Sequence, residues 1–346
     1  MKNLFTSILF LLAVAAAHLG QAQTIRRCNN SGLATAGVNI YTTLQAAHDA
    51  ASANDIIYLE PTNISYGNLV CVRPLTIIGN GYFLGQNPGL QLDIRESQAG
   101  IVTFANGSAG SRITGCVIGS LNIGASDVTV ERNQVRSNDV YIGYNPSLGP
   151  VKVSNIAVRQ NYLFRLYFYP GSATVNVSNV NVTNNILEGG ITTPTAVYAG
   201  LGNILISNNV VGGVTGSGNQ AQIEVDNAVI KNNIMTTAAS SFTPRNNAYS
   251  YNISAGTQFG TANSNRQNIS PASLFVGGTA STDGAFQLRT GSPAIGAGES
   301  GVDVGAFGGT TPYRIAGIPN VPTIYQYSQS VSGNTLNATI STKSNN

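Results

Sequence analysis

The sequence predicts an all-β solenoid built from short parallel strands. A seven-residue segment recurs five times at a nearly constant spacing, its residues alternate between apolar and polar, and asparagines mark its ends. The five copies are residues 127–133, 155–161, 179–185, 203–209 and 227–233. A repeat of this length indicates an architecture in which similar units stack and bury a continuous core.

Each copy predicts one strand of about five residues with one buried face. Successive side chains of a strand point to opposite sides, and the positions that alternate inward hold mostly Val and Ile, which favour strands. The closing asparagines, from Asn133 to Asn233, follow one another at intervals of 28, 24, 24 and 24 residues. If each strand pairs in parallel with its copy one coil later, at ~4.8 Å, identical residues form columns, and asparagine amides can bond to one another.

A different pattern precedes the repeats and predicts a helix that caps the N-terminal end of the stack. Thr42 and Gln45 have the spacing of a capping box, and apolar residues follow on one helical face. These apolar residues are Ile40, Leu44, Ala47 and Ala51. We therefore expect an N-terminal segment with a capping helix in residues 23–54, the coils in 55–311, and a Pro-containing linker and tail in 312–346. The tail is expected to form strands laid on the solenoid or to fray.

Residues 1–22 have the pattern of a secretory signal peptide. Lys2 precedes a short apolar run, and Gly20 and Ala22 give the small-x-small pattern of a cleavage site. The apolar run is shorter than the ~20 residues that cross a bilayer, and no later stretch is long enough. We expect an exported protein, secreted or held at the cell surface, with no membrane span.

Charge is sparse in this chain. Seventeen Lys and Arg stand against 14 Asp and Glu, so the formal net charge is +3 and charged residues make up only 9% of the total. No run or stripe of Lys and Arg appears, so we expect no nucleic-acid partner.

Three cysteines follow the signal peptide. Export would expose them to oxidising conditions, but an odd number cannot pair completely and the spacing leaves several pairings open, a Cys28–Cys71 bond among them. Cys116 has the same parity as Ile118 and is expected to be buried. No His or second Cys stands at ligand spacing, so no metal site is expected. His48 is expected on the surface.

These features resemble the right-handed parallel β-helix proteins of the pectate-lyase-like superfamily, of the exported bacterial type. Residues 44–61 and 73–79 resemble the capping helix and first coils of those proteins, and residues 292–295 with 303–306 resemble their closing segment. Gly296 stands where that segment often carries an acidic residue, so no role for a carboxylate there can be carried over. The resemblance implies a right-handed parallel β-helix but no particular activity, because one scaffold hosts unrelated functions.

The superfamily includes polysaccharide lyases and glycoside hydrolases, which makes an enzyme acting on an acidic glycan the first alternative. A lyase needs a base, often Arg, with Ca²⁺ as its cofactor, and a hydrolase needs paired carboxylates. The weak catalytic candidates are Arg165 and the pair Glu224 and Asp226, which alternation places on one strand face about 7 Å apart. One 24-residue period before Glu224 stands Gly200, which adds no ligand. Without lyase chemistry we expect no cofactor.

Aromatic residues are concentrated between residues 139 and 170. Alternation places Tyr167 and Tyr169 on one side of a strand, and stacked coils would bring an earlier tyrosine group beside them. Tyrosine rings are amphipathic platforms suited to sugar rings, and charged neighbours can supply hydrogen bonds. The predicted ligand-binding residues are Tyr141, Tyr144, Arg165, Tyr167, Tyr169 and Asp139.

The favoured function is therefore a secreted or cell-surface β-helix that is not catalytic and binds, or is displayed towards, polysaccharide. The alternatives are the lyase or hydrolase and a purely structural adhesin or spacer.

Overall fold

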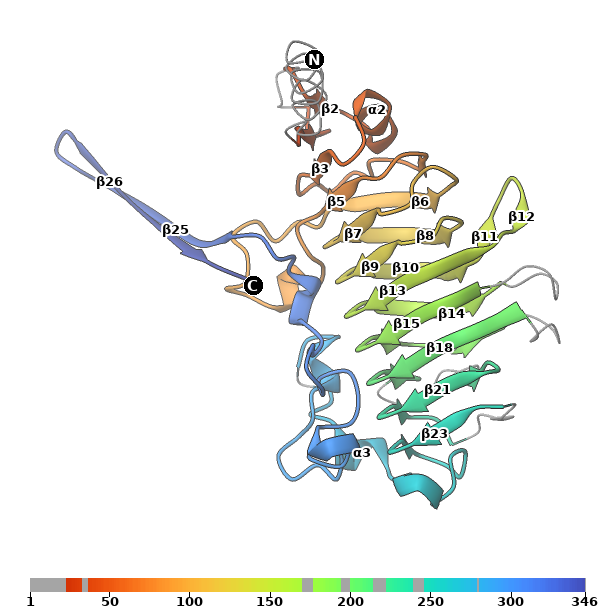
Figure 1. The fold of residues 1–346 in the computed structure, drawn as a ribbon. Helices are drawn as coiled ribbons and strands as arrows, with labels where there is room; N and C mark the ends of the chain where they lie inside the picture. The colour runs from red at the N-terminus through yellow and green to blue at the C-terminus, as the bar shows by residue number, and fades with distance from the viewer. Residues whose placement is uncertain are drawn as a thin grey trace, which may run out of the picture.

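The computed structural model describes residues 23–32, 37–169, 177–193, 200–213, 222–238, 246–278 and 280–345. These residues are almost all β, in two long parallel sheets that lie side by side (Figure 1). The predicted signal peptide, residues 1–22, lies outside the described residues. No helix in the described ranges is long and apolar enough to cross a membrane.

All the described strands except those of two hairpins belong to these two sheets. The first sheet is, in spatial order, β2 (Ile40–Tyr41), β1 (Ile25–Cys28), β3 (Ile56–Leu59), β5 (Thr76–Ile78), β7 (Arg112–Thr114), β9 (Thr129–Glu131), β13 (Val153–Arg159), β15 (Val177–Thr183), β18 (Leu201–Ser207), β21 (Ala228–Lys231) and β23 (Ala248–Ser250). The second is β4 (Leu69–Cys71), β6 (Gln98–Phe104), β8 (Val117–Ile123), β10 (Gln134–Ile142), β14 (Tyr162–Phe168), β16 (Ile186–Leu187), β19 (Val210–Val211), β22 (Ile234–Met235) and β24 (Ile253–Ser254), with β17 (Ile191–Thr192) and β20 (Ile223–Glu224) continuing beside β14.

Equivalent residues of the repeat lie beside one another, as the alignment of copies predicted. In the first sheet Val158 is opposite Val182, and Val182 is opposite Ile206. These side chains are fully buried in one continuous apolar core. Full burial of one such side chain stabilises the folded state by about 1.5–3 kcal/mol. Because every coil buries equivalent side chains, each coil adds a similar amount to the stability of the core.

The closing asparagines form a buried ladder. The backbone N–H of Asn161 donates to Oδ1 of Asn185, and that of Asn185 donates to Oδ1 of Asn209, both at 2.9 Å. All three residues are fully buried. The ladder runs past the fifth copy, because Asn233 and Asn252 continue the same bonds. It satisfies buried backbone donors at the corner between the two sheets, where strand pairing ends.

Two further columns sit at left-handed backbone positions. The opening residues of the five copies have φ between 53° and 59°, and the residues just before the closing asparagines have φ between 54° and 58°. The first group is Asp127, Asn155, Asn179, Asn203 and Asn227, and the second is Arg132, Gln160, Asn184, Asn208 and Asn232. Asparagine tolerates this conformation better than most residues, which accounts for its recurrence there.

Helix α2 (Leu44–Ala50) lies at the N-terminal end of the stack (Figure 1). Its N-cap is Thr43, whose Oγ1 accepts from the N–H of Ala46, rather than Thr42 as the capping-box spacing predicted. Leu44 and Ala47 are buried in the apolar core. The helix therefore places an apolar face on the first coils.

The helix also covers the edge of the second sheet. Gln45 Oε1 accepts from the N–H of Val70 at 2.8 Å, and His48 Nε2 accepts from the N–H of Val72 at 3.1 Å. The expectation of a surface histidine was wrong: His48 is only 1% exposed. These two side chains take the place of a further strand along β4, which reduces the exposed edge that could pair with another chain.

The described part of residues 262–318 packs on the outer side of the second sheet. Its only described α-helix is α3 (Pro271–Leu274). Its described 3₁₀ turns are η3 (Ala262–Ser264), η4 (Gly284–Phe286), η5 (Glu299–Gly301) and η6 (Ile315–Gly317). Another 3₁₀ turn, η1 (Leu84–Gln86), follows β5 much earlier in the chain. Together with outward residues of the sheet it forms a second apolar layer. That layer includes Tyr162, Ile186, Val210, Ile234, Phe275, Phe286, Val304 and Tyr313.

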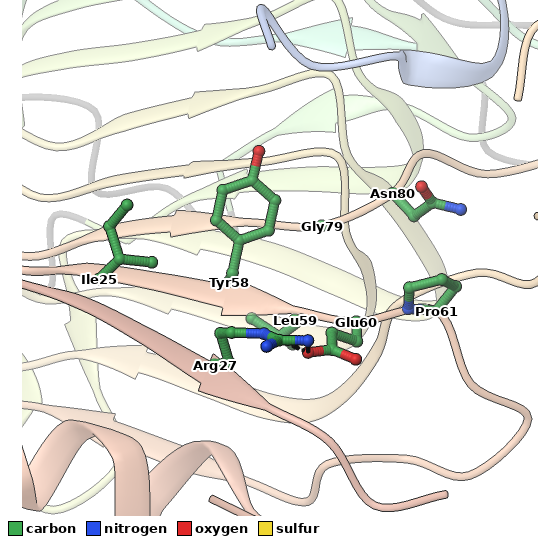
Figure 2. A pocket seen from close by; sticks show the side chains of 8 residues that line it. All are labelled: Ile25, Arg27, Tyr58, Leu59, Glu60, Pro61, Gly79 and Asn80. Carbon is green, nitrogen blue, oxygen red and sulfur yellow. Dashed lines mark hydrogen bonds and ion pairs between the residues drawn. The ribbon is translucent and has the colours of Figure 1, made fainter. Parts of the chain in front are cut away.

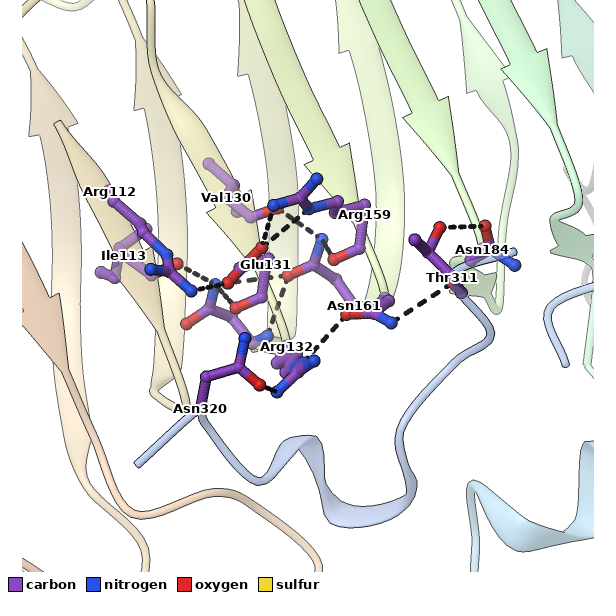
Figure 3. Close-up of polar contacts among 12 residues, drawn as sticks. Arg112, Ile113, Val130, Glu131, Arg132, Arg159, Asn161, Asn184, Thr311 and Asn320 are labelled. Carbon is purple, nitrogen blue, oxygen red and sulfur yellow. Dashed lines mark hydrogen bonds and ion pairs between the residues drawn. The ribbon is translucent and has the colours of Figure 1, made fainter. Parts of the chain in front are cut away.

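Residues 299–320 then run back towards the N-terminal end along one left-handed column. Asn184 Nδ2 donates to the carbonyls of Ala306 and Gly308, and Gln160 Nε2 donates to that of Pro312. Further along, Arg132 reaches Asn320 (Figure 3). The segment expected to supply closing turns therefore lies along the side of the stack, because amides on that column offer donors to its carbonyls.

The chain ends in an antiparallel hairpin, β25 (Thr323–Ser332) and β26 (Thr335–Lys343), which projects from the body (Figure 1). Nearly all of its residues are exposed. The tail is thus neither laid on the two parallel sheets nor frayed. A shorter hairpin, β11 (Tyr144–Asn145) with β12 (Gly149–Pro150), extends from the end of β10.

The cysteines are free thiols in the buried interior. No bond joins Cys28 to Cys71, so the pairing that the spacing left open is not formed. Burial raises the pKa of Cys28 to about 12, with a smaller contribution from Glu60, and burial also raises the pKa of Cys116. Thiols held this way are poor nucleophiles because the reactive species is the thiolate.

Candidate functional site

The predicted tyrosines meet on the outward face of the second sheet. Tyr141 of β10 is directly opposite Tyr167 of β14, and their rings stack with centroids 5.6 Å apart and planes 12° apart. Leu166 and Phe168 point inward and are fully buried, as alternation predicted. The two outward rings are half-buried, so part of each stays accessible.

Two more tyrosines extend this aromatic surface at the end of the strands. Tyr144 and Tyr169 lie with ring centroids 4.9 Å apart, and Tyr169 is 6.3 Å from Tyr141. Both are half-buried. Tyr144 begins β11, so the short hairpin holds it beside the sheet. The four rings thus form one aromatic cluster from two neighbouring coils.

An ion pair lies beside the stacked rings. Asp139 is opposite Arg165, and Arg165 Nε donates to Asp139 Oδ1 at 2.9 Å while Nη2 donates to Oδ2 at 3.3 Å. Tyr141 donates its hydroxyl proton to Asp139 Oδ2 at 3.0 Å. The guanidinium also lies 5.3 Å from the centroid of the Tyr167 ring. These contacts fix the positions of both rings.

Burial and the Asp139 carboxylate together shift the pKa values of Tyr141 and Arg165. Burial raises the pKa of Tyr141 to about 12, and the nearby Asp139 carboxylate adds to the effect. Burial alone would lower the pKa of Arg165, but Asp139 outweighs it and raises that pKa. Near neutral pH both groups therefore remain protonated, so the Arg165 guanidinium can only donate hydrogen bonds and the Tyr141 hydroxyl keeps the proton that it donates to Asp139.

The structure extends the cluster into a column that sequence reasoning missed. Successive strand pairings align one outward residue from each of six strands: Thr103, Asn122, Tyr141, Tyr167, Thr192 and Glu224. Asn122 Nδ2 donates to Thr103 Oγ1 at 3.1 Å. We call this column, together with Tyr144, Tyr169, Asp139 and Arg165, the tyrosine strip. Only the pairing register reveals it, because the spacing between its members changes from coil to coil.

The catalytic candidates are only partly brought together. Val225 is buried, and so is Asp226 at 7% exposure, whereas Glu224 is half-buried, so the two carboxylates do not share an exposed face. Glu224 lies opposite Thr192, not opposite Gly200 as the 24-residue period suggested, and it accepts from Gln222 Nε2 at 2.8 Å. Arg165 is on β14, and β17 separates that strand from β20, which carries Glu224.

Histidine, cysteine and carboxylate side chains are dispersed over the described ranges rather than grouped. No cluster of three or more His, Cys, Asp or Glu residues that could hold an ion is found there. The second-sheet surface therefore offers hydroxyls, amides and aromatic faces rather than a set of convergent carboxylates.

A cavity of about 400 Å³ lies elsewhere, on the first sheet (Figure 2). It is lined by Ile25, Arg27, Tyr58, Leu59, Glu60, Pro61, Gly79 and Asn80. Arg27 and Glu60 form an ion pair at 2.5 Å in its wall, and Asn29 also donates to Glu60. Its charged groups thus satisfy one another, and sequence reasoning had not singled it out.

Comparisons with protein-family models, with curated proteins and with solved structures give no match.

Proposed function

We propose that this protein is an exported right-handed parallel β-helix of the pectate-lyase-like type, capped by α2, whose tyrosine strip binds polysaccharide without cleaving it. The parallel pairing of each coil with the next and the buried asparagine ladder support the β-helix. The pattern of residues 1–22 supports export, to the medium or the cell surface.

The observation that carries the binding proposal is the stacked pair Tyr141 and Tyr167 held by an adjacent ion pair. Their partly exposed faces give a sugar ring an apolar platform. Asp139 and Arg165 lock the rings in place, which reduces the entropy that binding would otherwise cost. A platform fixed in this way suits recognition of a repeating sugar chain.

The state of the candidate base favours binding over cleavage. A lyase base must accept a proton, but the contacts with Asp139 raise the pKa of Arg165 and keep it protonated. Glu224 is two strands away and is bonded to Gln222. We propose no cofactor, and we give Ca²⁺ no role.

Binding is tested by replacing both platform rings. The double variant Tyr141→Ala with Tyr167→Ala should lose about tenfold or more in affinity for the polysaccharide that retains the wild type, because each stacking face contributes about 0.5–1.5 kcal/mol. Affinity electrophoresis in gels containing individual polysaccharides measures this. Tyr327→Ala, on the exposed hairpin, is the control and should bind like the wild type. Unchanged retention of the double variant would favour the adhesin or spacer function.

The enzymatic alternative rests on the two carboxylates of Glu224 and Asp226, which stand on either side of Val225 in the sequence. It predicts that incubation with acidic glycans, with and without Ca²⁺, yields unsaturated products or new reducing ends. It further predicts that Glu224→Ala or Arg165→Ala abolishes this turnover. Robust product formation by the wild type would overturn the non-catalytic proposal.

A further inference from the structure

The tyrosine strip has no cation left to pair with an acidic sugar. Its one cationic side chain is Arg165, and Asp139 engages that guanidinium through two nitrogens. The Asp139 side chain is only 7% exposed, so the pair is largely desolvated and its Coulomb attraction is little screened. A uronate carboxylate would have to compete with a buried carboxylate already in place.

The other charged residues near the rings, Glu224 and Arg136, also disfavour an anionic sugar chain. Glu224 stands in the same column as Tyr167, two strands further on, and leaves that part of the strip negative. Arg136, on the same strand as Tyr141, is bonded to Glu96 at 2.5 Å. An anionic sugar chain placed over the rings would therefore meet like charge and no unpaired guanidinium.

We propose that the tyrosine strip selects uncharged glycans and that Asp139 is the residue that sets this selectivity. This inference rests on the proposed function and adds the class of ligand to it. Asp139 acts by occupying Arg165. The neutral ring then stacks on Tyr141 and Tyr167, and its hydroxyls bond to the half-buried Thr192 of the same column.

The test compares one glycan backbone in two charge states. A neutral polysaccharide that retains the wild type is fragmented to oligosaccharides, and a portion is oxidised at C6 to uronates. Titration calorimetry at low salt should show that the wild type binds the neutral oligosaccharides at least about tenfold more tightly than the oxidised ones. Tighter binding of the oxidised form would overturn the proposal without any variant.

The variant Asp139→Asn keeps the shape of the side chain and an acceptor for Tyr141 while releasing the charge of Arg165. In this variant the ratio of the affinity for neutral oligosaccharides to the affinity for oxidised oligosaccharides should fall at least about tenfold. Added salt should weaken the variant's new binding of the oxidised oligosaccharides. Asp127→Asn, the same charge change at an exposed turn of the first sheet, should leave the preference unchanged. A preference in Asp139→Asn equal to that of the wild type would overturn the role of Asp139.

A second variant guards against misfolding. Asp139→Asn combined with Arg165→Gln places two neutral, hydrogen-bonding groups at the pair and should lose the gained binding of uronates. If this double variant binds uronates as well as Asp139→Asn does, Arg165 is not their partner and the inference fails. If the wild type retains no polysaccharide at all, the proposed function itself fails, which is a distinct outcome.

Discussion

At the scale of single residues, the buried asparagine ladder is the feature most sensitive to substitution. Asn185 is fully buried, accepts from the backbone N–H of Asn161 and donates to the carbonyl of Val158. Asn185→Ala should lower the free energy of unfolding by about 2–4 kcal/mol, because it leaves buried donors and acceptors unpaired. Chemical denaturation followed by circular dichroism measures this.

The matched control is the exposed asparagine column. Asn179 has φ of 53° and bonds to Asn155 at the surface, so Asn179→Gly keeps the backbone conformation and exposes no buried group. Its unfolding free energy should stay within about 0.5 kcal/mol of the wild type. Equal losses at both positions would mean that backbone conformation, rather than buried hydrogen bonding, explains why asparagine recurs.

The sequence identified these residues because each column repeats one residue type at one spacing. It also brought the two tyrosine groups onto neighbouring coils, but it did not place Tyr141 opposite Tyr167, because Tyr141 follows Asn133 by eight residues and Tyr167 follows Asn161 by six. It did not reveal Thr103 or Thr192 in the same column. The coils before residue 127 lack the repeat, and the strand register shifts between Val135 and Asp139, so counting residues cannot align them.

At the scale of elements, α2 shows how a terminal unit ends a parallel sheet. Its side chains accept the N–H groups of Val70 and Val72 that a further strand would otherwise pair. An apolar periodicity predicts such a helix but not this role, because the N–H groups it covers belong to a strand 24 or more residues later. The prediction of an exposed His48 was wrong for the same reason. The residue is buried by the chain around β4, which the periodicity of its own helix does not reveal.

The contribution of α2 is testable at His48. His48→Ala should lower the free energy of unfolding by about 2–3 kcal/mol. The substitution leaves a cavity where the buried imidazole was and leaves the Val72 N–H without its acceptor. Thermal unfolding measures this, with Ala50→Ser as the control in the same helix, because Ala50 is exposed. A His48→Ala variant as stable as the wild type would show that water replaces the ring at the sheet edge.

At the scale of the whole molecule, the C-terminal segment divides into a packed part and a projecting part. Tyr313 is buried, and its hydroxyl lies 2.6 Å from that of Tyr82 and donates to Asp283 at 3.2 Å. The second apolar layer thus joins Tyr82, which follows β5, to Tyr313, which lies 231 residues later in the chain. In contrast, the final hairpin buries almost nothing, although isolated two-stranded hairpins are marginal in water.

Two truncations separate these parts. Ending the chain after Asn320 removes only the hairpin and should shift the melting temperature by no more than about 2 °C. Ending it after Thr311 also removes Tyr313 and Ile318, leaves Asp283 without its tyrosine and exposes the apolar layer beneath. Each large side chain lost from burial costs about 1.5–3 kcal/mol, so the melting temperature should fall by about 10 °C. If both truncated proteins melt at the same temperature, residues 312–320 contribute nothing to stability. If truncation after Asn320 already lowers the melting temperature by about 10 °C, the hairpin contributes to the stability of the fold.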